Sequence, residues 1–169
     1  MTEKMTYPNE YIDELISEAD SAITRNEPKE AKNILNEILS IEPAFSVAHN
    51  YLGWLYMYYF HNYTLAESHL RLAIKFAPAY PPAFQNLGAL KVMMKQYDEA
   101  EEILRQGLSY GGSNVMYIYE ELGKIYELRG KLFLARRYYK MAIKNCMDND
   151  YMEDLRKHLR RCRLKIFLF

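Results

Sequence analysis

Apolar residues recur at spacings of three and four along almost the whole chain, and polar residues fill the positions between them. This period predicts amphipathic α-helices. Prolines and glycines interrupt it at short intervals, and connections this short place successive helices antiparallel. The pattern predicts helices over about residues 10–25, 28–42, 45–60, 65–77, 81–95, 97–109, 114–129, 131–147 and 151–167.

Several helix starts carry a capping signature. Thr64 with Glu67, and Asp150 with Glu153, have the spacing of a capping box. Pro28 suits the first turn of a helix, where a missing N–H costs nothing. Ser113 or Asn114 is expected to cap the helix that follows the two glycines at 111 and 112.

The helix pairs repeat one spacing of small residues. Gly53, Gly88 and Gly123 are 35 residues apart, and a Leu precedes each one. An Ala stands 12 or 13 residues after each Gly, and the positions four and seven residues after that Ala are again apolar or small. The three sets are Ala66, Leu70 and Ala73; Ala100, Leu104 and Gly107; and Ala135, Tyr139 and Ala142. Small residues let two helix backbones approach closely, and one such pair cannot bury its apolar surface without neighbours.

This set of positions resembles the tetratricopeptide repeat, a helix–turn–helix unit of about 34 residues with a Leu-Gly, an Ala and a terminal Pro. Ala31, Leu35 and Ile38 show the same Ala, +4 and +7 pattern once more upstream, which adds a fourth unit. The resemblance then covers roughly residues 11–148. It implies an all-α fold, a right-handed α-solenoid of antiparallel helix pairs. The chain departs from the family in its weak first helix, in one inserted residue near 61–63, and in the missing Pro after units three and four.

The expected organisation is a flexible N-terminus over residues 1–9, four repeats over about 12–45, 46–80, 81–115 and 116–149, and a capping helix over 150–169, with no separate domain boundary. The last helix carries one apolar stripe, formed by Met152, Leu155, Leu159, Cys162, Ile166 and Phe169. The stripe favours a cap on the fourth repeat. Leu164, Phe167 and Leu168 lie off the stripe and leave a second interpretation open, in which this helix docks on another chain or, less favoured, on an anionic membrane.

Charge is balanced overall and uneven along the chain. Lys and Arg number 22, as do Asp and Glu, so no global charge favours nucleic acid or a membrane. The first 45 residues carry −6 and the last 42 carry +8. Solvated helix faces are the favoured interpretation; a basic end that contacts an acidic partner, or a second copy, is the alternative, with candidate residues Arg136, Arg137, Arg156, Arg160 and Arg161.

Cysteine use and hydropathy point to a soluble, cytoplasmic protein. Cys146 and Cys162 match no zinc or redox spacing and are expected to be reduced and at least half-buried on adjacent helices. The N-terminus lacks the basic and apolar regions of a signal peptide. The longest apolar run, residues 51–60, is about half of the ~20 residues that a membrane span needs.

No constellation of catalytic residues is found in the sequence. The four histidines, at 49, 61, 69 and 158, fall in no metal-binding motif, so no metal or cofactor is expected. His49 is at a position expected to be buried, so a packed histidine is favoured over a ligand. The acidic pairs at 101–102 and 120–121 are adjacent on helices and are expected to solvate a surface rather than act as acid and base. The chain is therefore not expected to be an enzyme.

The resemblance implies a concave groove, lined by the first helix of each repeat, that takes a peptide or a partner helix. The groove positions of this chain hold Asn50, Tyr51, Trp54, Met57, Gln85, Asn86, Ala89, Tyr117, Glu120 and Lys124. Trp54, the only Trp, either anchors a partner there or packs against the first helix. Of the positions at which some members grip a carboxylate terminus, only Asn86 matches in type, so that mode of binding is not expected.

The predicted function is protein–protein interaction, as an adaptor, scaffold or co-chaperone. The alternative is a structural protein whose repeats serve self-assembly and form a homo-oligomer through the repeat ends or the C-terminal helix. The expected partner is a protein or peptide; no nucleic acid is expected, and a membrane is disfavoured. The identity of the partner does not follow from the groove, because a fold hosts many functions.

Overall fold

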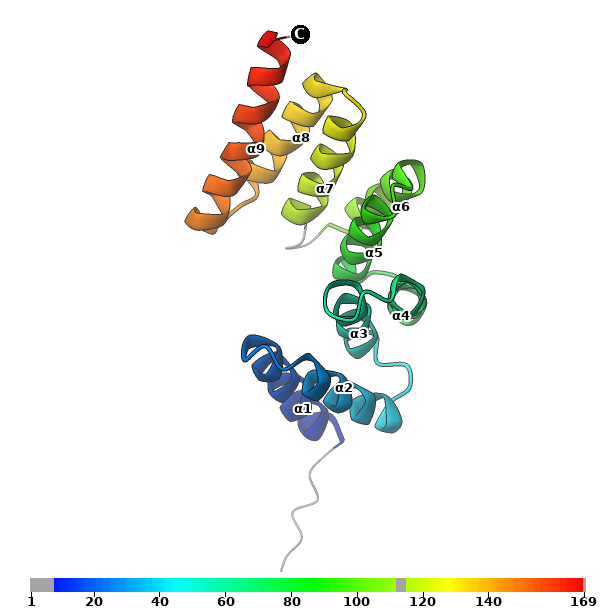
Figure 1. Cartoon of the computed structure of the whole chain (residues 1–169). Helices are drawn as coiled ribbons and strands as arrows, with labels where there is room; N and C mark the ends of the chain where they lie inside the picture. The colour runs from blue at the N-terminus through cyan, green and yellow to red at the C-terminus, as the bar shows by residue number, and fades with distance from the viewer. Residues whose placement is uncertain (1–7, 112–114, 169) are drawn as a thin grey trace, which may run out of the picture. The chain divides into compact units, whose positions relative to one another are not determined.

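The computed structural model describes residues 8–111 and 115–168, and all the regular structure in these ranges is α-helical (Figure 1). The helices are α1 (Pro8–Thr24), α2 (Pro28–Ile41), α3 (Ser46–Tyr58), α4 (Tyr63–Phe76), α5 (Pro81–Met93), α6 (Tyr97–Ser109), α7 (Val115–Leu128), α8 (Leu132–Lys144) and α9 (Asn149–Leu168). The predictions for residues 1–7, for Ser113 and Asn114 as caps, and for Phe169 in the apolar stripe lie outside the described residues.

The chain divides into two compact units, Met1–Pro78 and Ala79–Phe169. No boundary at this position was predicted from the sequence. In the first unit α1 pairs with α2 and α3 pairs with α4, while α2 contacts α3. Its core lies between these helices and includes Ile12, Leu15, Ala19, Leu35, Ile38, Leu52 and Leu55.

In the second unit α5 pairs with α6, α7 pairs with α8, and α9 lies alongside α8 (Figure 1). The helix α7 also contacts both α5 and α6. One part of the core joins α6 to α7 through Leu104, Ile118 and Leu122, and another joins α8 to α9 through Tyr139 and Cys162. Since α9 buries Leu155 and Cys162, it covers the α7–α8 pair as a terminal helix.

The small-residue register of the sequence is confirmed at three helix pairs. A Cβ atom placed on Gly53 would lie 2.5 Å from Cγ of Leu70, and one on Gly88 would lie 2.5 Å from Cγ of Leu104. In the next pair, a Cβ on Gly123 would lie 2.7 Å from the ring of Tyr139. Each glycine is therefore a point of close approach between the two helices, and any side chain there would displace a core residue.

Each turn inside a helix pair contains one residue with positive φ. These residues are Asn26, His61, Lys95 and Gly130, with φ of 62°, 50°, 60° and 71°. The next N–H donates to a carbonyl five residues back in three of the turns, as Gln96 does to Lys91, which satisfies a free carbonyl at the helix end. In the turn after α3 the bond from Asn62 reaches six residues back, to Tyr56. The residue inserted near 61–63 is thus absorbed at the end of α3.

The two predicted capping boxes are each wrong by two residues. The side chain of Asn62, not Thr64, caps α4, and its Oδ1 accepts from the N–H of Leu65 at 3.1 Å. At the start of α9, Oδ1 of Asp148, not of Asp150, accepts from the N–H groups of residues 150 and 151 at 2.8 and 2.9 Å. In both cases the polar residue just before the first helical turn is the one within reach of the free N–H groups.

Candidate functional site

A row of buried charged side chains runs along α7 and meets α9. Glu120, Glu121, Lys124 and Glu127 are one, three and three residues apart, which places them along one side of the helix. The three carboxylates are only 6%, 8% and 9% exposed. Burying a carboxylate is costly unless it is paired and hydrogen-bonded. Each of the three is paired, and α9 supplies several of the partners.

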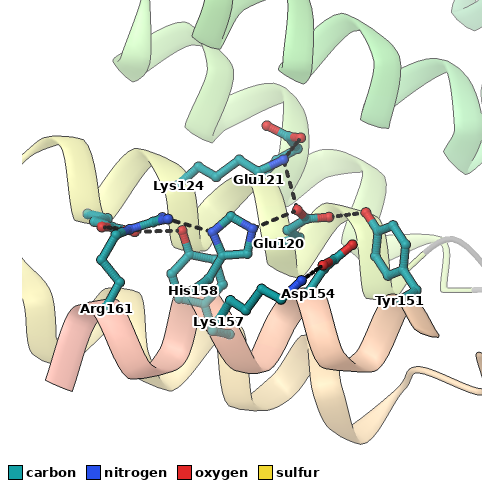
Figure 2. A network of polar contacts seen from close by, with 10 residues as sticks. Glu120, Glu121, Lys124, Tyr151, Asp154, Lys157, His158 and Arg161 are labelled. Carbon is teal, nitrogen blue, oxygen red and sulfur yellow. Dashed lines mark hydrogen bonds and ion pairs between the residues drawn. The ribbon is translucent and has the colours of Figure 1, made fainter. Parts of the chain in front are cut away.

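The first half of this row is centred on Lys124. Its Nζ lies 2.9 Å from Oε1 of Glu120 and 2.8 Å from Oε1 of Glu121. Tyr151 of α9 donates its hydroxyl hydrogen to Oε2 of Glu120, and Nε2 of His158 lies 3.9 Å from Oε1 (Figure 2). Glu120 is therefore held by side chains from both α7 and α9.

The ionisation of these groups follows from their burial and their neighbours. Burial disfavours the charged form of Lys124, but the two adjacent carboxylates outweigh it and raise the pKa of this amine. The pKa of Glu121 is raised, because its burial outweighs the attraction of Lys124. Burial, together with the positive charge of Arg161, lowers the pKa of His158. At neutral pH Lys124 is thus charged and His158 is neutral.

The second half of the row is centred on Glu127. Arg161 donates from Nε to Oε1 at 2.6 Å and from a terminal nitrogen to Oε2 at 2.7 Å, which is a two-pronged contact. Lys165 donates to Oε1 at 2.8 Å and the hydroxyl of Tyr139 donates to Oε2 at 3.0 Å. Burial opposes ionisation, but these donors outweigh it and lower the pKa of Glu127 to about 2.

An open concavity of about 420 Å³ lies beside Glu127. It is lined by side chains of four helices: Val92 of α5, Lys124, Glu127 and Leu128 of α7, Tyr139 of α8, and His158, Arg161 and Lys165 of α9. Leu128 is 59% exposed, so it offers apolar surface to a ligand. A site with this composition can bury an apolar side chain and orient its polar neighbours through fixed donors and one acceptor.

Comparison with known sequences gives one partial relative. No protein-family model matches the chain. The chain is 33% identical over 81 residues to the PsbB mRNA maturation factor Mbb1, chloroplastic, of Chlamydomonas reinhardtii, a match that covers 48% of this chain and 12% of that protein. The chain therefore spans only a small part of that relative's length.

Comparison with solved structures identifies the fold. PilF of Pseudomonas aeruginosa matches with a TM-score of 0.78 at 22% identity, over 96% of this chain and 76% of that one. TTC0263, a thermophilic TPR protein of Thermus thermophilus, matches with a TM-score of 0.76 at 20% identity, over 96% and 84% of the two chains. The first TPR of Spaghetti (RPAP3), solved with the HSP90 peptide SRMEEVD, matches at 0.63 and 19% identity, over 70% and 93%.

The chain has the tetratricopeptide-repeat fold. Its helix pairs are the repeats, and α9 is the terminal helix that the sequence predicted. The first helices of the two repeats in the second unit are α5 and α7, and both line the concavity.

Six of the predicted groove residues of this tetratricopeptide-repeat chain lie in the second unit. Lys124 lines the concavity and Glu120 lies beside it in the charged row. Tyr117 is exposed and lies edge-on to Tyr151, with 5.4 Å between ring centroids. On α5, Asn86 and Ala89 are buried and Gln85 is half-buried. The structure thus places one of the six, Lys124, in the lining of the concavity, and the role of all six in binding stays a prediction.

The other four predicted groove residues lie on α3 in the first unit. Met57 is fully buried and Asn50 is 6% exposed, while Tyr51 is half-buried. Trp54 is half-buried, packs against the core of this unit, and contacts the rings of Tyr58 and Tyr59. A binding role for this set also stays a prediction.

The five arginines predicted as a basic end differ in their surroundings. Arg161 is bound to Glu127, and Arg156 and Arg160 lie 3.5 and 2.9 Å from the carboxylate oxygens of Glu153. Arg136 and Arg137 form no ion pair with any residue in the described ranges. Three of the five charges are therefore partly neutralised by neighbours, and two are available to a partner.

Sequence reasoning missed the residues through which α9 meets the row. Tyr151, His158 and Lys165 are seven residues apart, so they lie along one side of the helix. Arg161 falls between the last two on the same side. The spacing of these polar residues shows in the sequence that they share one side of the last helix. The spacing does not show which neighbouring helix that side contacts.

The expectation that the adjacent carboxylates solvate a surface is wrong for three of the four. Glu120 and Glu121 are buried and share Lys124. Glu101 lies 2.9 Å from Arg105 and 2.8 Å from Arg129, and its pKa is lowered, because the hydrogen bonds from Tyr126 and the arginines outweigh its burial. Glu102 is exposed, as expected. In the sequence, carboxylates that pair with a neighbouring helix have the same spacing as carboxylates on a solvated helix face, so the two cannot be distinguished there.

His49 and the two cysteines lie in the packed interior. His49 is buried, and its Nδ1 lies 3.0 Å from Nδ1 of His69 while its Nε2 lies 3.0 Å from the carbonyl oxygen of Pro43. Cys146 and Cys162 are free and buried, as predicted, but Cys146 lies in the loop between α8 and α9 and not on a helix. Burial, with the nearby Glu127, raises the pKa of the Cys162 thiol to about 11. Among the described residues no group of three His, Cys, Asp or Glu side chains could hold a metal ion.

Proposed function

We propose that the chain is a protein-interaction module, an adaptor, scaffold or co-chaperone, and that the concavity between α5, α7 and α9 binds a segment of a partner protein. The observation that carries the proposal is the combination of exposed apolar surface at Leu128 with the fixed donors of Arg161 and Lys165 in one concave site. Such a site favours an extended or helical segment that places an apolar side chain over Leu128.

The fold supports this proposal. The tetratricopeptide-repeat domain of RPAP3 was solved with the HSP90 peptide SRMEEVD, which shows that one protein of this fold takes a peptide. The acidic tail of that peptide is a poor match for this chain, because the cations that line the concavity, Lys124, Arg161 and Lys165, are already paired with Glu120, Glu121 and Glu127. We expect a ligand segment that is not strongly acidic.

The chemistry of the row favours binding over catalysis. A pKa of about 2 leaves Glu127 ionised throughout the neutral range, so it is a poor general acid or base. The proposal therefore assigns no catalytic step to the concavity. Within the described residues no helix has the length and apolar character needed to cross a bilayer, and the predicted cytoplasmic location remains a prediction.

A selection experiment tests the proposal. A random library of displayed peptides is selected on the full chain, and the affinity of the selected peptides is measured for the full chain and for Leu128→Asp. We expect at least about a tenfold loss of affinity, because a charge replaces apolar contact at the centre of the site. The control is Leu65→Asp, an equally drastic change of an exposed leucine on α4, 40% exposed, which should leave binding unchanged. Peptides that bind both variants equally would contradict the proposal.

A further inference from the structure

The end of the second unit formed by α8 and α9 exposes apolar side chains beside cations. Phe133, Leu164, Phe167 and Leu168 are 72%, 62%, 89% and 71% exposed. An open hollow of about 430 Å³ includes two of them, Leu164 and Phe167, in its lining, together with Arg136, Arg163 and Ile166. We call these residues the basic face. Contiguous exposed apolar surface rimmed by polar groups is typical of an interaction site.

The basic face carries two arginine side chains, Arg136 and Arg163. Neither Arg136 nor Arg163 forms an ion pair with any residue that the structure describes, in contrast to Arg161 and Lys165 on the same end of the chain. Arg137, Lys140 and Lys144 lie nearby in sequence on α8, and within residues 8–111 and 115–168 none of them has an ion-pair partner. The face therefore presents uncompensated positive charge beside apolar surface, which fits an acidic partner surface with apolar residues of its own.

A surface of that kind exists in the first unit. The hydroxyl of Tyr11 on α1 donates to Oε1 of Glu37 on α2 at 2.6 Å, which brings the start of α1 beside the end of α2. Tyr11 is 39% exposed, and Ile41, one helical turn beyond Glu37, is 43% exposed. Two apolar side chains thus lie at one end of the α1–α2 pair.

Carboxylates lie beside Tyr11 on two helices, with Glu37 on α2 and with Glu14 and Glu18 three and seven residues further along α1. The hydrogen bond from Tyr11 to Glu37, with the charges of Glu18 and Glu14, raises the pKa of its hydroxyl, so all three carboxylates act on this group. The helix α1 contains no Lys or Arg, and Glu14 and Glu18 have no cation partner among the described residues. We call Tyr11, Glu14, Glu18, Glu37 and Ile41 the acidic face.

We propose that the basic face of one chain binds the acidic face of a second copy. The contact joins two different surfaces, so it is heterologous and leaves one free face of each kind on the pair, which lets further copies add in a chain or close into a ring. Charge complementarity sets the orientation, and the apolar residues at the centre of each face supply contact area.

Two charge-reversed variants of the full chain test this inference. The first, Glu14→Lys with Glu18→Lys, removes the acidic face; the second, Arg136→Glu with Arg163→Glu, removes the basic face. Sedimentation velocity of the wild type should show species larger than the monomer that grow with concentration and shrink as salt is raised from about 0.05 to about 0.5 M. Each variant alone should remain monomeric, with an association constant at least about tenfold lower.

Mixing the variants gives the decisive result. The first variant keeps its basic face and the second keeps its acidic face, so an equimolar mixture should form a dimer of one chain of each kind and nothing larger. A control that reverses two exposed lysines outside both faces, Lys75→Glu with Lys95→Glu, should assemble like the wild type. Circular dichroism checks that every variant keeps its helical content.

Other outcomes overturn the inference. A wild type that is monomeric at every concentration and salt would contradict it, as would either variant assembling alone, because that would indicate contact between two like faces. Flotation with vesicles containing an anionic lipid distinguishes a further case. If the monomeric wild type binds these vesicles and the Arg136→Glu, Arg163→Glu variant does not, the basic face is a membrane surface and the proposal is wrong.

Discussion

Arg161 on α9 contacts both carboxylate oxygens of Glu127 on α7, at 2.6 and 2.7 Å. The carboxylate is 9% exposed, and its other donors are Lys165 and Tyr139. This relationship ties the terminal helix to the last repeat and at the same time places two cations beside the concavity. The same contact therefore serves both stability and the proposed binding site.

Arg161→Met should destabilise the second unit. Removing one partner leaves a buried carboxylate less well compensated, which is costly; because Arg161 is half exposed and Lys165 remains, we expect a loss of about 1–2 kcal/mol. Urea unfolding followed by circular dichroism measures it. The matched control is Arg156→Met on the same helix, whose exposed pair with Glu153 at 3.5 Å should contribute little. Equal losses in the two variants would show that the contact to Glu127 is not stabilising.

Gly88→Leu should destabilise the α5–α6 pair strongly. The first carbon of the new side chain would meet Leu104, so the pair must separate, at a cost of about 1–3 kcal/mol or more. The melting temperature by circular dichroism checks this. Gly111→Asn is the control, because no atom lies within 4 Å of a Cβ there and Asn tolerates its φ of 69° better than most residues. An unchanged melting temperature for Gly88→Leu would contradict the repeat register.

The repeat register could be predicted from the sequence, whereas the charged row could not. Gly88 and Leu104 repeat in type and spacing in neighbouring units, so their contact follows from helical geometry alone. The pairing of Arg161 with Glu127 depends on how α9 rotates against α7 and α8, and a single sequence carries no repeat of that contact. The caps at Asn62 and Asp148 were missed for a related reason: several polar residues precede each helix, and only the backbone decides which one reaches the free N–H groups.

Deleting residues 150–169 should produce aggregation. The helix α9 covers Tyr139 and Ala135 with Cys162, and it covers Met116 and Ala142 with Leu155. Its loss exposes these apolar residues and leaves Glu127 without Arg161 and Lys165. Light scattering during a thermal melt measures the effect. A truncated chain that stays monomeric and melts at the temperature of the parent would show that α9 is not a cap.

The first unit should lose stability as the pH falls below about 6.5. The two facing Nδ1 atoms of His49 and His69 lie 3.0 Å apart, and the ring of His69 is half-buried, so a positive charge on His69 is disfavoured in the folded unit. Burial and the neighbouring His49 lower the pKa of His69. A lowered pKa means that the folded unit binds fewer protons than the unfolded chain. This contribution to stability is complete above the ordinary pKa and is lost as the pH falls from there toward the lowered pKa.

Fluorescence of Trp54, the single Trp of the chain, isolates this effect because Trp54 packs in the first unit. We expect the unfolding temperature that it reports to fall between pH 7.5 and 5.5 in the wild type, and to change less in His69→Asn. His61→Asn, at an exposed position with positive φ, is the control and should keep the dependence of the wild type. A slope unaltered by His69→Asn would refute the role of this pair.

The central claim, that the concavity between α5, α7 and α9 binds a partner segment, is tested most directly by site-specific photocrosslinking. A photoreactive phenylalanine analogue is placed at Leu128 in one sample and at the similarly exposed Leu65 in another, and each is irradiated in an extract of the protein's own cells. We predict a discrete crosslinked partner from position 128 that is absent from position 65 and is competed by the selected peptides. Identical crosslinks from the two positions, or none from position 128, would contradict the account.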